Sequence, residues 1–306
     1  MLGLSRALML VVMGLLVGRL VWRAAPAVHR EELLAASSAI AAVDSRGRRL
    51  VLPAPPRRIV SLSPGTTEML FALGLRGRIV ADTAYCDYPP EAKSLPKIGD
   101  VETSVEKVAA QRPDLVVADS IANRRAIEPL ERLHLPVFTV PQGSLDQSLD
   151  ALRMLGRATG QTSQAESLSR ALRARIDRVR LAVSRDPAKP RVLDIVQMEP
   201  LMVVGGANFM NDLITLASGV NDGQSAGQGW AAYSPERVAA DRPDVILCGK
   251  SSIDPIRRRP GWSGVPAIRN GAVYALHSET ARPGPRSIDA LEELARLLHP
   301  RAFAVR

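Results

Sequence analysis

Few residues in this 306-residue sequence have the type and spacing that chemistry needs, and the most distinctive of them are aromatic. Trp230 follows a glycine-rich segment, residues 223–229, where a loop makes little demand on core packing, and Tyr85 opens the segment Tyr85–Pro90. Two such aromatic rings can close on the flat face of a large, partly apolar ligand. Ordinary core packing is the alternative interpretation of both residues.

Two further groups of residues offer polar contacts to a ligand. The first is a turn that consists of Ser63, Pro64 and Gly65. Its helix N-terminal amides could face a ligand, although an ordinary N-cap explains the same residues. The second is the loop after an expected strand over residues 273–276, and it carries His277, Glu279 and Arg282. These side chains could bind the periphery of a ligand or simply belong to a surface loop.

No catalytic motif accompanies these residues. The sequence lacks GxSxG, a P-loop, HExxH and GxGxxG, and Gly205–Gly206 followed by Asn208 is too slight for a phosphate cradle. An exported hydrolase is the alternative from another functional class, and it would need a nucleophile, a base and an orienting group within hydrogen-bond reach. The sequence indicates a binding protein rather than an enzyme.

Metal-binding and disulfide patterns are weak. The chain has four histidines, none of them at i, i+4 spacing, and this makes a histidine-rich metal site improbable. Cys86 and Cys248 belong to no CxxC motif, so free thiols are the simplest interpretation, and a bridge between the two would fix a cleft shut. We expect no resident metal and no cofactor.

The basic charge of the chain does not indicate a nucleic-acid partner. The formal net charge is +9, from 40 basic and 31 acidic residues, but only five of the basic residues are lysines and the arginines are scattered. The longest basic run is Arg257–Arg259, aromatic residues make up only 4%, and no zinc-finger or basic-zipper pattern occurs.

The first 27 residues are typical of a signal peptide or an N-terminal anchor. A twelve-residue apolar run, residues 7–18, is shorter than the roughly 20 residues that a membrane span needs. Cleavage near Ala25–Ala27 would release the protein, whereas an uncleaved segment would tether it to the inner membrane. Because no cysteine precedes Cys86, we expect no lipid-modified N-terminal cysteine. Either way, a periplasmic or other extracytoplasmic location is expected.

An internal repeat organises the elements that must position these residues. From residue 44 onward, short apolar runs alternate with amphipathic helical patterns, which predicts parallel sheets covered by helices. SVEKVAAQRPDLVVADS at 104–120 matches SPERVAADRPDVILCGK at 234–250 at eight of seventeen positions. In each copy serine caps a short helix, glutamate follows at its second position, Arg-Pro-Asp ends it and a strand comes next. The two copies lie 130 residues apart, and a single repeat at so long a distance indicates two related lobes rather than a solenoid.

A long helix over about residues 164–184 is predicted between the two copies. Ser163 and Glu166 predict a capping box at its start. One stripe of the helix is apolar and consists of Leu168, Leu172, Ile176, Val179 and Val183. The opposite, arginine-rich face is expected to lie in solvent. Such a helix would be a stiff spine that limits hinge motion between the lobes.

Four segments carry a resemblance to a known family. They are RIVSLSPGTTEMLFALG (58–74), AYCDYPPEAKSLPKIGD (84–100), SVEKVAAQRPDLVVA (104–118) and RPGPRSIDALEELARLLHP (282–300). From about Val43 to Pro300 the chain resembles the periplasmic binding proteins that feed ABC importers of cobalamin, ferric siderophores and haem. Tyr85 and Trp230 fall where the cobalamin-binding branch places aromatic ligand contacts. Asp100–Glu102 stand where that branch carries a further aromatic residue.

The resemblance implies an α/β fold of two pseudo-symmetric lobes, with parallel-type sheets, joined by one long helix. The implied divisions are a signal peptide or anchor (1–27), a linker (28–43), an N-terminal lobe (44–142), connecting helices with the spine (143–187) and a C-terminal lobe (188–306). The implied function is delivery of cobalamin or a related corrinoid to an ABC importer by a monomer. A ferric siderophore or haem is the alternative ligand, so any metal would arrive inside the ligand.

The repeat contains one residue in each copy that the family would use for docking. The resemblance implies that Glu106 and Glu236 contact basic residues on the membrane subunits of the importer. The alternative explanation is local, because an acidic residue in the first turn of a helix is favoured by the helix dipole without any partner.

Overall fold

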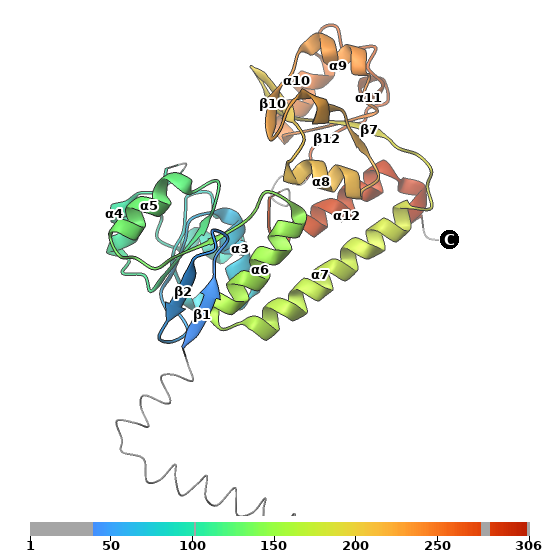
Figure 1. Ribbon diagram of the computed structural model, residues 1–306. Coiled ribbons are helices and arrows are strands. Elements are labelled where there is room, and N and C mark those ends of the chain that lie inside the picture. Colours follow the sequence, from blue (N-terminus) through green and yellow to red (C-terminus); the bar gives the residue numbers. More distant parts are fainter. Residues whose placement is uncertain (1–38, 101, 277–281, 305–306) are drawn as a thin grey trace, which may run out of the picture.

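The computed structural model describes residues 39–100, 102–276 and 282–304, which form two α/β lobes joined by helices (Figure 1). The predicted signal peptide or anchor, residues 1–27, lies outside the described residues. Within the described ranges, none of the helices combines the length and the apolar character needed to cross a membrane.

The N-terminal lobe is built on a four-stranded parallel sheet in the order β4-β3-β5-β6. Its strands are β3 (Ile59–Ser61), β4 (Ile79–Ala81), β5 (Leu115–Asp119) and β6 (Val137–Val140). Its helices are α3 (Pro64–Ala72), α4 (Val105–Ala110) and α5 (Arg124–Arg132). Strands β5 and β6 are buried along their whole length, as expected for parallel strands covered on both faces.

An antiparallel hairpin precedes this sheet. Strand β1 (Ile40–Val43) pairs with β2 (Arg49–Leu52). The prediction that a linker extends to residue 43 is therefore wrong, because residues 40–43 are paired backbone that packs against the N-terminal lobe.

The C-terminal lobe contains a six-stranded mixed sheet in the order β10-β8-β7-β11-β12, with β9 paired to β7. Its strands are β7 (Arg191–Met198), β8 (Leu201–Val204), β9 (Val220–Asn221), β10 (Trp230–Ala232), β11 (Val245–Cys248) and β12 (Val273–Tyr274). Its helices are α8 (Phe209–Leu216), α9 (Pro235–Asp241), α10 (Ile253–Arg257) and α11 (Pro266–Arg269).

The expectation of a parallel-type sheet holds for the centre of the C-terminal lobe but not for its edge. Strands β7, β9, β11 and β12 are parallel, whereas β8 pairs antiparallel with β7 and β10 pairs antiparallel with β8. Only two residues, Glu199 and Pro200, connect β7 to β8. A connection that short can join only antiparallel strands, since a parallel pair needs a long crossover.

The internal repeat corresponds to the same local structure in both lobes. Ser104 caps α4 by accepting from the N–H of Lys107, and Ser234 caps α9 by accepting from the N–H of Arg237. Each helix is followed by a parallel strand, β5 or β11, that pairs with the first strand of its lobe, β3 or β7. The prediction of two related lobes is confirmed.

The aspartate of the repeated Arg-Pro-Asp has a structural role in both copies. Asp114 accepts from the backbone N–H groups of Arg57 and Arg58, each at 2.8 Å. Asp244 accepts from the N–H of Arg191 at 2.9 Å. Each carboxylate therefore joins the turn between the helix and the strand of the repeat to the start of the neighbouring strand.

The predicted spine is helix α7 (Thr162–Val183), which runs beside both lobes (Figure 1). The apolar stripe packs into the core as expected. The predicted capping box is wrong, because the helix begins at Thr162 and its N-cap, Gln161, makes no side-chain cap. The preceding helix α6 (Leu145–Thr159) is followed by Gly160, whose φ is +75°, and α7 begins two residues later, so Ser163 is already its second residue rather than its N-cap.

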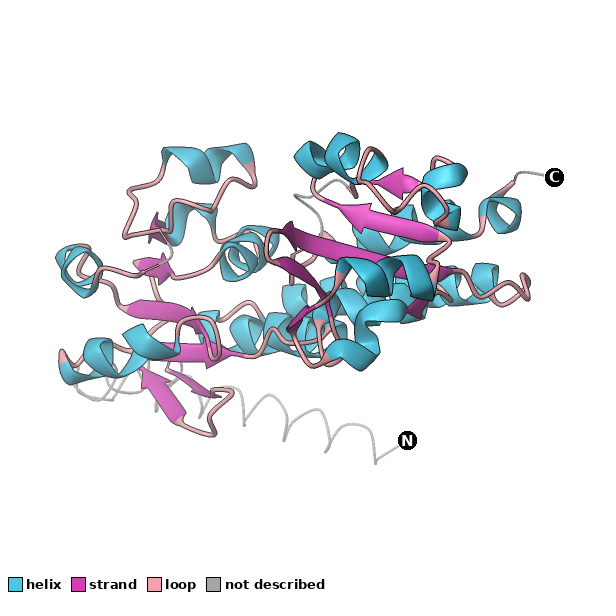
Figure 2. Ribbon diagram, turned by 90° about the horizontal axis from the view of Figure 1, so that it is seen from above, coloured by secondary structure: helices cyan, strands magenta, loops and turns pink. Residues whose placement is uncertain are grey.

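One continuous hydrophobic core passes from one lobe to the other. It contains side chains of α3, α6, α7, α8 and the last helix, α12 (Ser287–Leu298). Arg175 of α7 also forms ion pairs with Asp289 at 2.6 Å and Glu292 at 2.9 Å on α12. Seen from above, the strands form two separate groups with helices around them (Figure 2). The lobes are therefore joined by packed helices rather than by a single flexible connection.

Candidate ligand-binding site

Tyr85 lies in the loop that leaves the carboxyl end of β4. Its side chain is 50% exposed, so core packing does not account for it. The backbone beneath it is anchored, because Sγ of the buried Cys86 lies 3.2 Å from the hydroxyl oxygens of Thr67 and Thr83. An exposed ring on an anchored loop is a suitable arrangement for contact with a ligand.

Lys97 closes the base of the same loop. Its ammonium group donates to Oδ1 of Asp82 at 2.6 Å and to the carbonyl oxygens of Ala92 at 2.8 Å and Cys86 at 3.4 Å. Asp82 is fully buried, and this burial raises its pKa to about 6 even though Lys97 acts in the opposite direction. The stretch from Asp82 to Lys97 is thus held together by one half-buried cation.

Trp230 is the first residue of β10, at the edge of the C-terminal sheet. Its side chain is 71% exposed, although its backbone pairs with Val204 of β8. Gly229, immediately before it, has a φ of +69°, a conformation that a side chain would disfavour. Figure 1 shows β10 on the side of the C-terminal lobe that is nearer the N-terminal lobe.

The two aromatic residues come from different lobes, as the sequence indicates. Among the described residues, no hydrogen bond or ring contact joins Tyr85 to Trp230. Both side chains are free to meet a ligand, and their roles as ligand contacts stay predictions.

The turn formed by Ser63, Pro64 and Gly65 is occupied by contacts within the protein. Oγ of Ser63 accepts from the N–H of Thr66 at 3.3 Å, and Oγ1 of Thr66 accepts from the N–H of Ser63 at 3.3 Å. A Cβ atom on Gly65 would lie 2.2 Å from the carbonyl oxygen of Pro283. The N-cap interpretation accounts for Ser63, and Pro283 covers Gly65, while a ligand contact by this turn stays a prediction.

Of the three residues predicted after β12, only Arg282 belongs to the described part; His277 and Glu279 lie outside it. The guanidinium of Arg282 donates to the carbonyl oxygen of Tyr85 at 3.1 Å and to Oδ1 of Asp87 at 2.9 Å. The structure thus brings together Tyr85 and Arg282, which the sequence predicted as separate ligand contacts.

Asp194 is a buried carboxyl group that sequence analysis missed. It lies in β7, in register with Leu247 of β11, and no described residue forms a hydrogen bond with its side chain. Burial raises the pKa of Asp194 to about 7. A weak signal was available, because aligning the two lobes at Arg58 and Arg191 sets Asp194 opposite the small polar residue Ser61.

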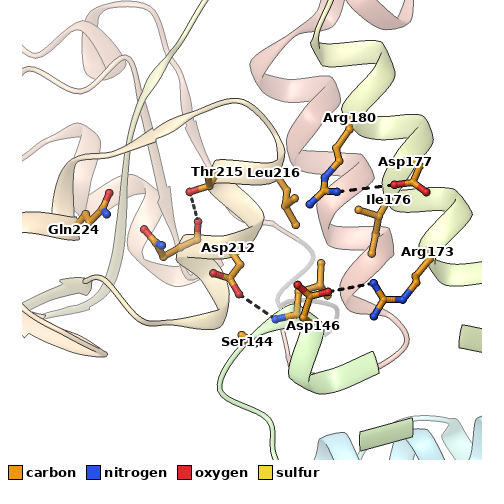
Figure 3. Close-up of a pocket in the computed structure, with 12 residues that line it drawn as sticks. Ser144, Asp146, Arg173, Ile176, Asp177, Arg180, Asp212, Thr215, Leu216 and Gln224 are labelled. Carbon is orange, nitrogen blue, oxygen red and sulfur yellow. Dashed lines mark hydrogen bonds and ion pairs between the residues drawn. The ribbon is translucent and has the colours of Figure 1, made fainter. Parts of the chain in front are cut away.

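A cavity of about 580 Å³ lies where α6, α7 and α8 meet (Figure 3). Its lining includes Asp146, Arg173, Arg180 and Asp212. Arg173 donates to Asp146 at 3.4 Å, so part of this charge is compensated within the wall. None of the residues predicted to contact a ligand lines the cavity. Tyr85 and Trp230 themselves are therefore not part of its wall, although Gln224 of the glycine-rich segment before Trp230 is.

The two repeated glutamates lie on exposed helix starts, at the outer ends of the two lobes where Figure 1 labels α4 and α9. Glu106 and Glu236 are each the second residue of their helix and are exposed. The pKa of Glu106 is lowered by its own backbone N–H and by the hydroxyl of Ser104, which donates to it at 3.0 Å. These local contacts account for the acid at this position, and docking stays a prediction.

Both cysteines are free and buried, which agrees with the expectation of separate thiols. Burial raises the pKa of Cys86, and it raises the pKa of Cys248 to about 11, so neither is a reactive thiolate at neutral pH. Within residues 39–100, 102–276 and 282–304, no group of three metal-ligating side chains is present.

Comparison with known proteins agrees with this architecture. An uncharacterised ABC transporter substrate-binding lipoprotein of Bacillus subtilis is 29% identical over 270 residues, which cover 85% of each chain. The periplasmic vitamin B12 binding protein of Vibrio cholerae has a similar crystal structure, with a TM-score of 0.74, 25% identity and coverage of 82% of this chain and 99% of that one. The periplasmic heme-binding protein of Roseiflexus sp. RS-1 matches with a TM-score of 0.74 and 28% identity, over 80% and 99% of the two chains.

The names of these proteins describe binding proteins rather than enzymes, and the substrate-binding component of an ABC transporter is among them. The predicted fold of two lobes on a helical spine is confirmed by the two solved structures. Residues 59–280, more than half of the sequence, match the periplasmic binding protein family. This chain belongs to that family.

Proposed function

We propose that this chain is the extracytoplasmic solute-binding component of an ABC importer and that it carries a bulky metal chelate, with cobalamin or a related corrinoid as the first candidate. The observation that carries the proposal is the exposure of Tyr85 and Trp230, each on its own lobe of a binding-protein fold. Large exposed aromatic side chains suit a flat, partly apolar ligand. The vitamin B12 binding protein among the similar structures supports a corrinoid.

Titration by tryptophan fluorescence tests the proposal. Of the three tryptophans, Trp22 belongs to the predicted signal peptide or anchor and Trp262 is almost fully buried, so in protein without residues 1–27 quenching by cyanocobalamin should come mainly from Trp230. We expect Trp230→Ala to remove most of the quenching and to weaken binding by about tenfold or more. Leu181→Ala is a suitable control, because Leu181 is an exposed apolar residue on the spine. Two outcomes would refute the assignment. In one, wild type and Trp230→Ala bind every chelate with the same affinity; in the other, neither protein binds any chelate.

Haem or a ferric siderophore is the second candidate ligand. Asp100 and Glu102 lie where the cobalamin-binding branch carries an aromatic residue, and a heme-binding protein is among the similar structures. The same titration with haemin and with ferrichrome separates these ligands from cyanocobalamin. In each case the metal belongs to the ligand, and the protein holds no cofactor of its own.

The partner in this proposal is the pair of membrane subunits of the importer. Glu106 and Glu236 would meet basic residues there, one from each lobe, since exposed charges of this kind orient and register a docking surface. We also propose that the protein acts as a monomer outside the cytoplasm, either released or tethered by its N-terminal segment.

A further inference from the structure

Residues 282–286, Arg-Pro-Gly-Pro-Arg, connect the C-terminal lobe to α12 but also contact the N-terminal lobe. Arg282 hydrogen bonds to the Tyr85 carbonyl and to Asp87. Arg286, four residues later, reaches α3 of the N-terminal lobe. Two arginines from the second half of the chain therefore contact the N-terminal lobe, and one of them, Arg282, contacts the segment that carries the proposed ligand contact Tyr85.

The strongest of these contacts is the ion pair between Arg286 and Glu68. Nε donates to Oε2 at 2.9 Å and Nη2 donates to Oε1 at 2.6 Å, so both prongs of the guanidinium are used. The side chains are only 12% and 4% exposed. Burial raises the pKa of Glu68, although Arg286 opposes this shift. A buried bidentate pair has one favoured geometry, and it fixes the guanidinium plane relative to α3.

The same guanidinium holds an aromatic ring of the Tyr85 loop. The Arg286 guanidinium carbon lies 3.6 Å from the centroid of the Tyr88 ring, and Tyr88 is 41% exposed on its other sides. Stacking on a planar guanidinium restricts the orientation of the ring. Arg282 fixes the backbone at Tyr85, and Arg286 fixes the side chain at Tyr88. Both ends of the Tyr85–Tyr88 stretch are therefore held by the 282–286 segment.

Helix α12 connects the 282–286 segment to the spine, α7. It begins at Ser287, directly after Arg286, and two of its acidic residues pair with Arg175 of α7. The Tyr85–Tyr88 stretch is thus connected to α7 through Arg286, α12 and the ion pairs of Arg175. This connection is additional to its own attachment to β4.

We propose that Arg286 is a positioning residue, which together with Arg282 holds the Tyr85–Tyr88 stretch in its ligand-binding orientation before any ligand arrives. The ligand-related part of this inference rests on the proposed function, whereas the ordering of the loop does not. A loop that is already ordered loses less conformational entropy on binding, and affinity rises accordingly.

Amide hydrogen exchange of the purified protein tests the ordering directly. The double variant Glu68→Gln with Arg286→Gln removes both charges, so no unpaired buried charge remains to unfold the protein. We expect exchange in residues 84–88 to accelerate by about tenfold, which corresponds to about 1.4 kcal/mol. Arg286→Lys keeps the charge but loses the planar fork, and it should give an intermediate rate.

Arg132→Gln is the matched control, because it removes an exposed arginine that pairs with Glu128 within α5 of the same lobe. Its exchange in residues 84–88 should equal that of wild type. Unchanged exchange of the loop in the double variant, or equal acceleration throughout the N-terminal lobe, would overturn the inference.

Ligand titration completes the test and keeps two possible failures apart. If the wild type binds cyanocobalamin or haemin, the double variant should bind it about tenfold more weakly, and equal affinity despite a loosened loop would refute a role in ligand binding. If the wild type binds neither, the proposed function fails, while the exchange result still decides whether Arg286 orders the loop.

Discussion

The carboxylate of Asp212 in α8 accepts a hydrogen bond from the backbone N–H of Leu145, the first residue of α6, at 3.0 Å (Figure 3). A residue of the C-terminal lobe thereby satisfies one of the free N–H groups at the start of a helix that belongs to the shared core. Both residues line the 580 Å³ cavity between α6, α7 and α8. Their hydrogen bond is one of the polar connections that keep the two lobes at a fixed distance.

The first prediction concerns this contact. Asp212→Ala leaves the start of α6 with an unsatisfied N–H group, and the free energy of unfolding should fall by about 1 kcal/mol. Urea unfolding followed by circular dichroism measures the change. Asp150→Ala on the exposed side of α6 is the control and should alter stability by less than about 0.5 kcal/mol. Equal stabilities of the two variants would contradict the capping role.

The second prediction is that ligand binding changes the distance between the lobes very little. Helices α6, α7, α8 and α12 share one hydrophobic core that extends into both lobes, so a wide hinge motion would have to break packed contacts. Small-angle scattering of the protein with and without its ligand should give nearly equal radii of gyration. A large decrease on binding would mean that the shared core rearranges.

The third prediction uses Asp194. Its pKa rises from 3.8 in the unfolded chain to about 7 in the fold, so between these values the native state binds the extra proton. The free energy of unfolding should therefore fall as the pH rises from about 4 to 7, and the wild type should be least stable above pH 7. Asp194→Asn removes this titration and should be more stable than wild type at pH 8, by on the order of 2–4 kcal/mol.

Urea unfolding at pH 5 and pH 8 measures this difference. Other groups also titrate over this range, so the informative quantity is the wild type minus the variant at each pH. Asp150→Asn is an exposed control and should follow the wild-type pH dependence. If Asp194→Asn also follows it, the carboxyl group is not buried as the structure has it.

The fourth prediction concerns docking. Because Glu106 and Glu236 are exposed, Glu106→Lys with Glu236→Lys should leave folding and ligand affinity nearly unchanged. The same double variant should abolish uptake through the cognate importer, because each lobe would present the wrong charge. Transport into proteoliposomes or cells measures the effect, with Glu128→Lys on α5 as an exposed acidic control. Normal uptake, or a loss of ligand binding, would count against the docking role.

Much of the fold can be predicted from the amino-acid sequence, because its strongest signals are local or repeated. The 104–120 and 234–250 copies contain their own caps and strand patterns, and the stripe from Leu168 to Val183 has the period of a helix. These patterns depend on residues a few positions apart, and the structure confirms the two lobes and the spine. The hairpin formed by residues 40–52 was not predicted, because its four-residue strands are short and their pairing produces no periodic pattern in the sequence.

The contacts that hold the site together depend on the tertiary structure. About two hundred residues separate the two members of each pair, Arg282 with Tyr85 and Arg286 with Glu68, and no local pattern predicts such contacts. Burial of Gly65 beneath Pro283, and of Asp194 within its sheet, likewise depends on what packs against these residues from elsewhere in the chain. Exposure and charge pairing are properties of the assembled lobes, whereas helix caps and periodicity are properties of neighbouring residues.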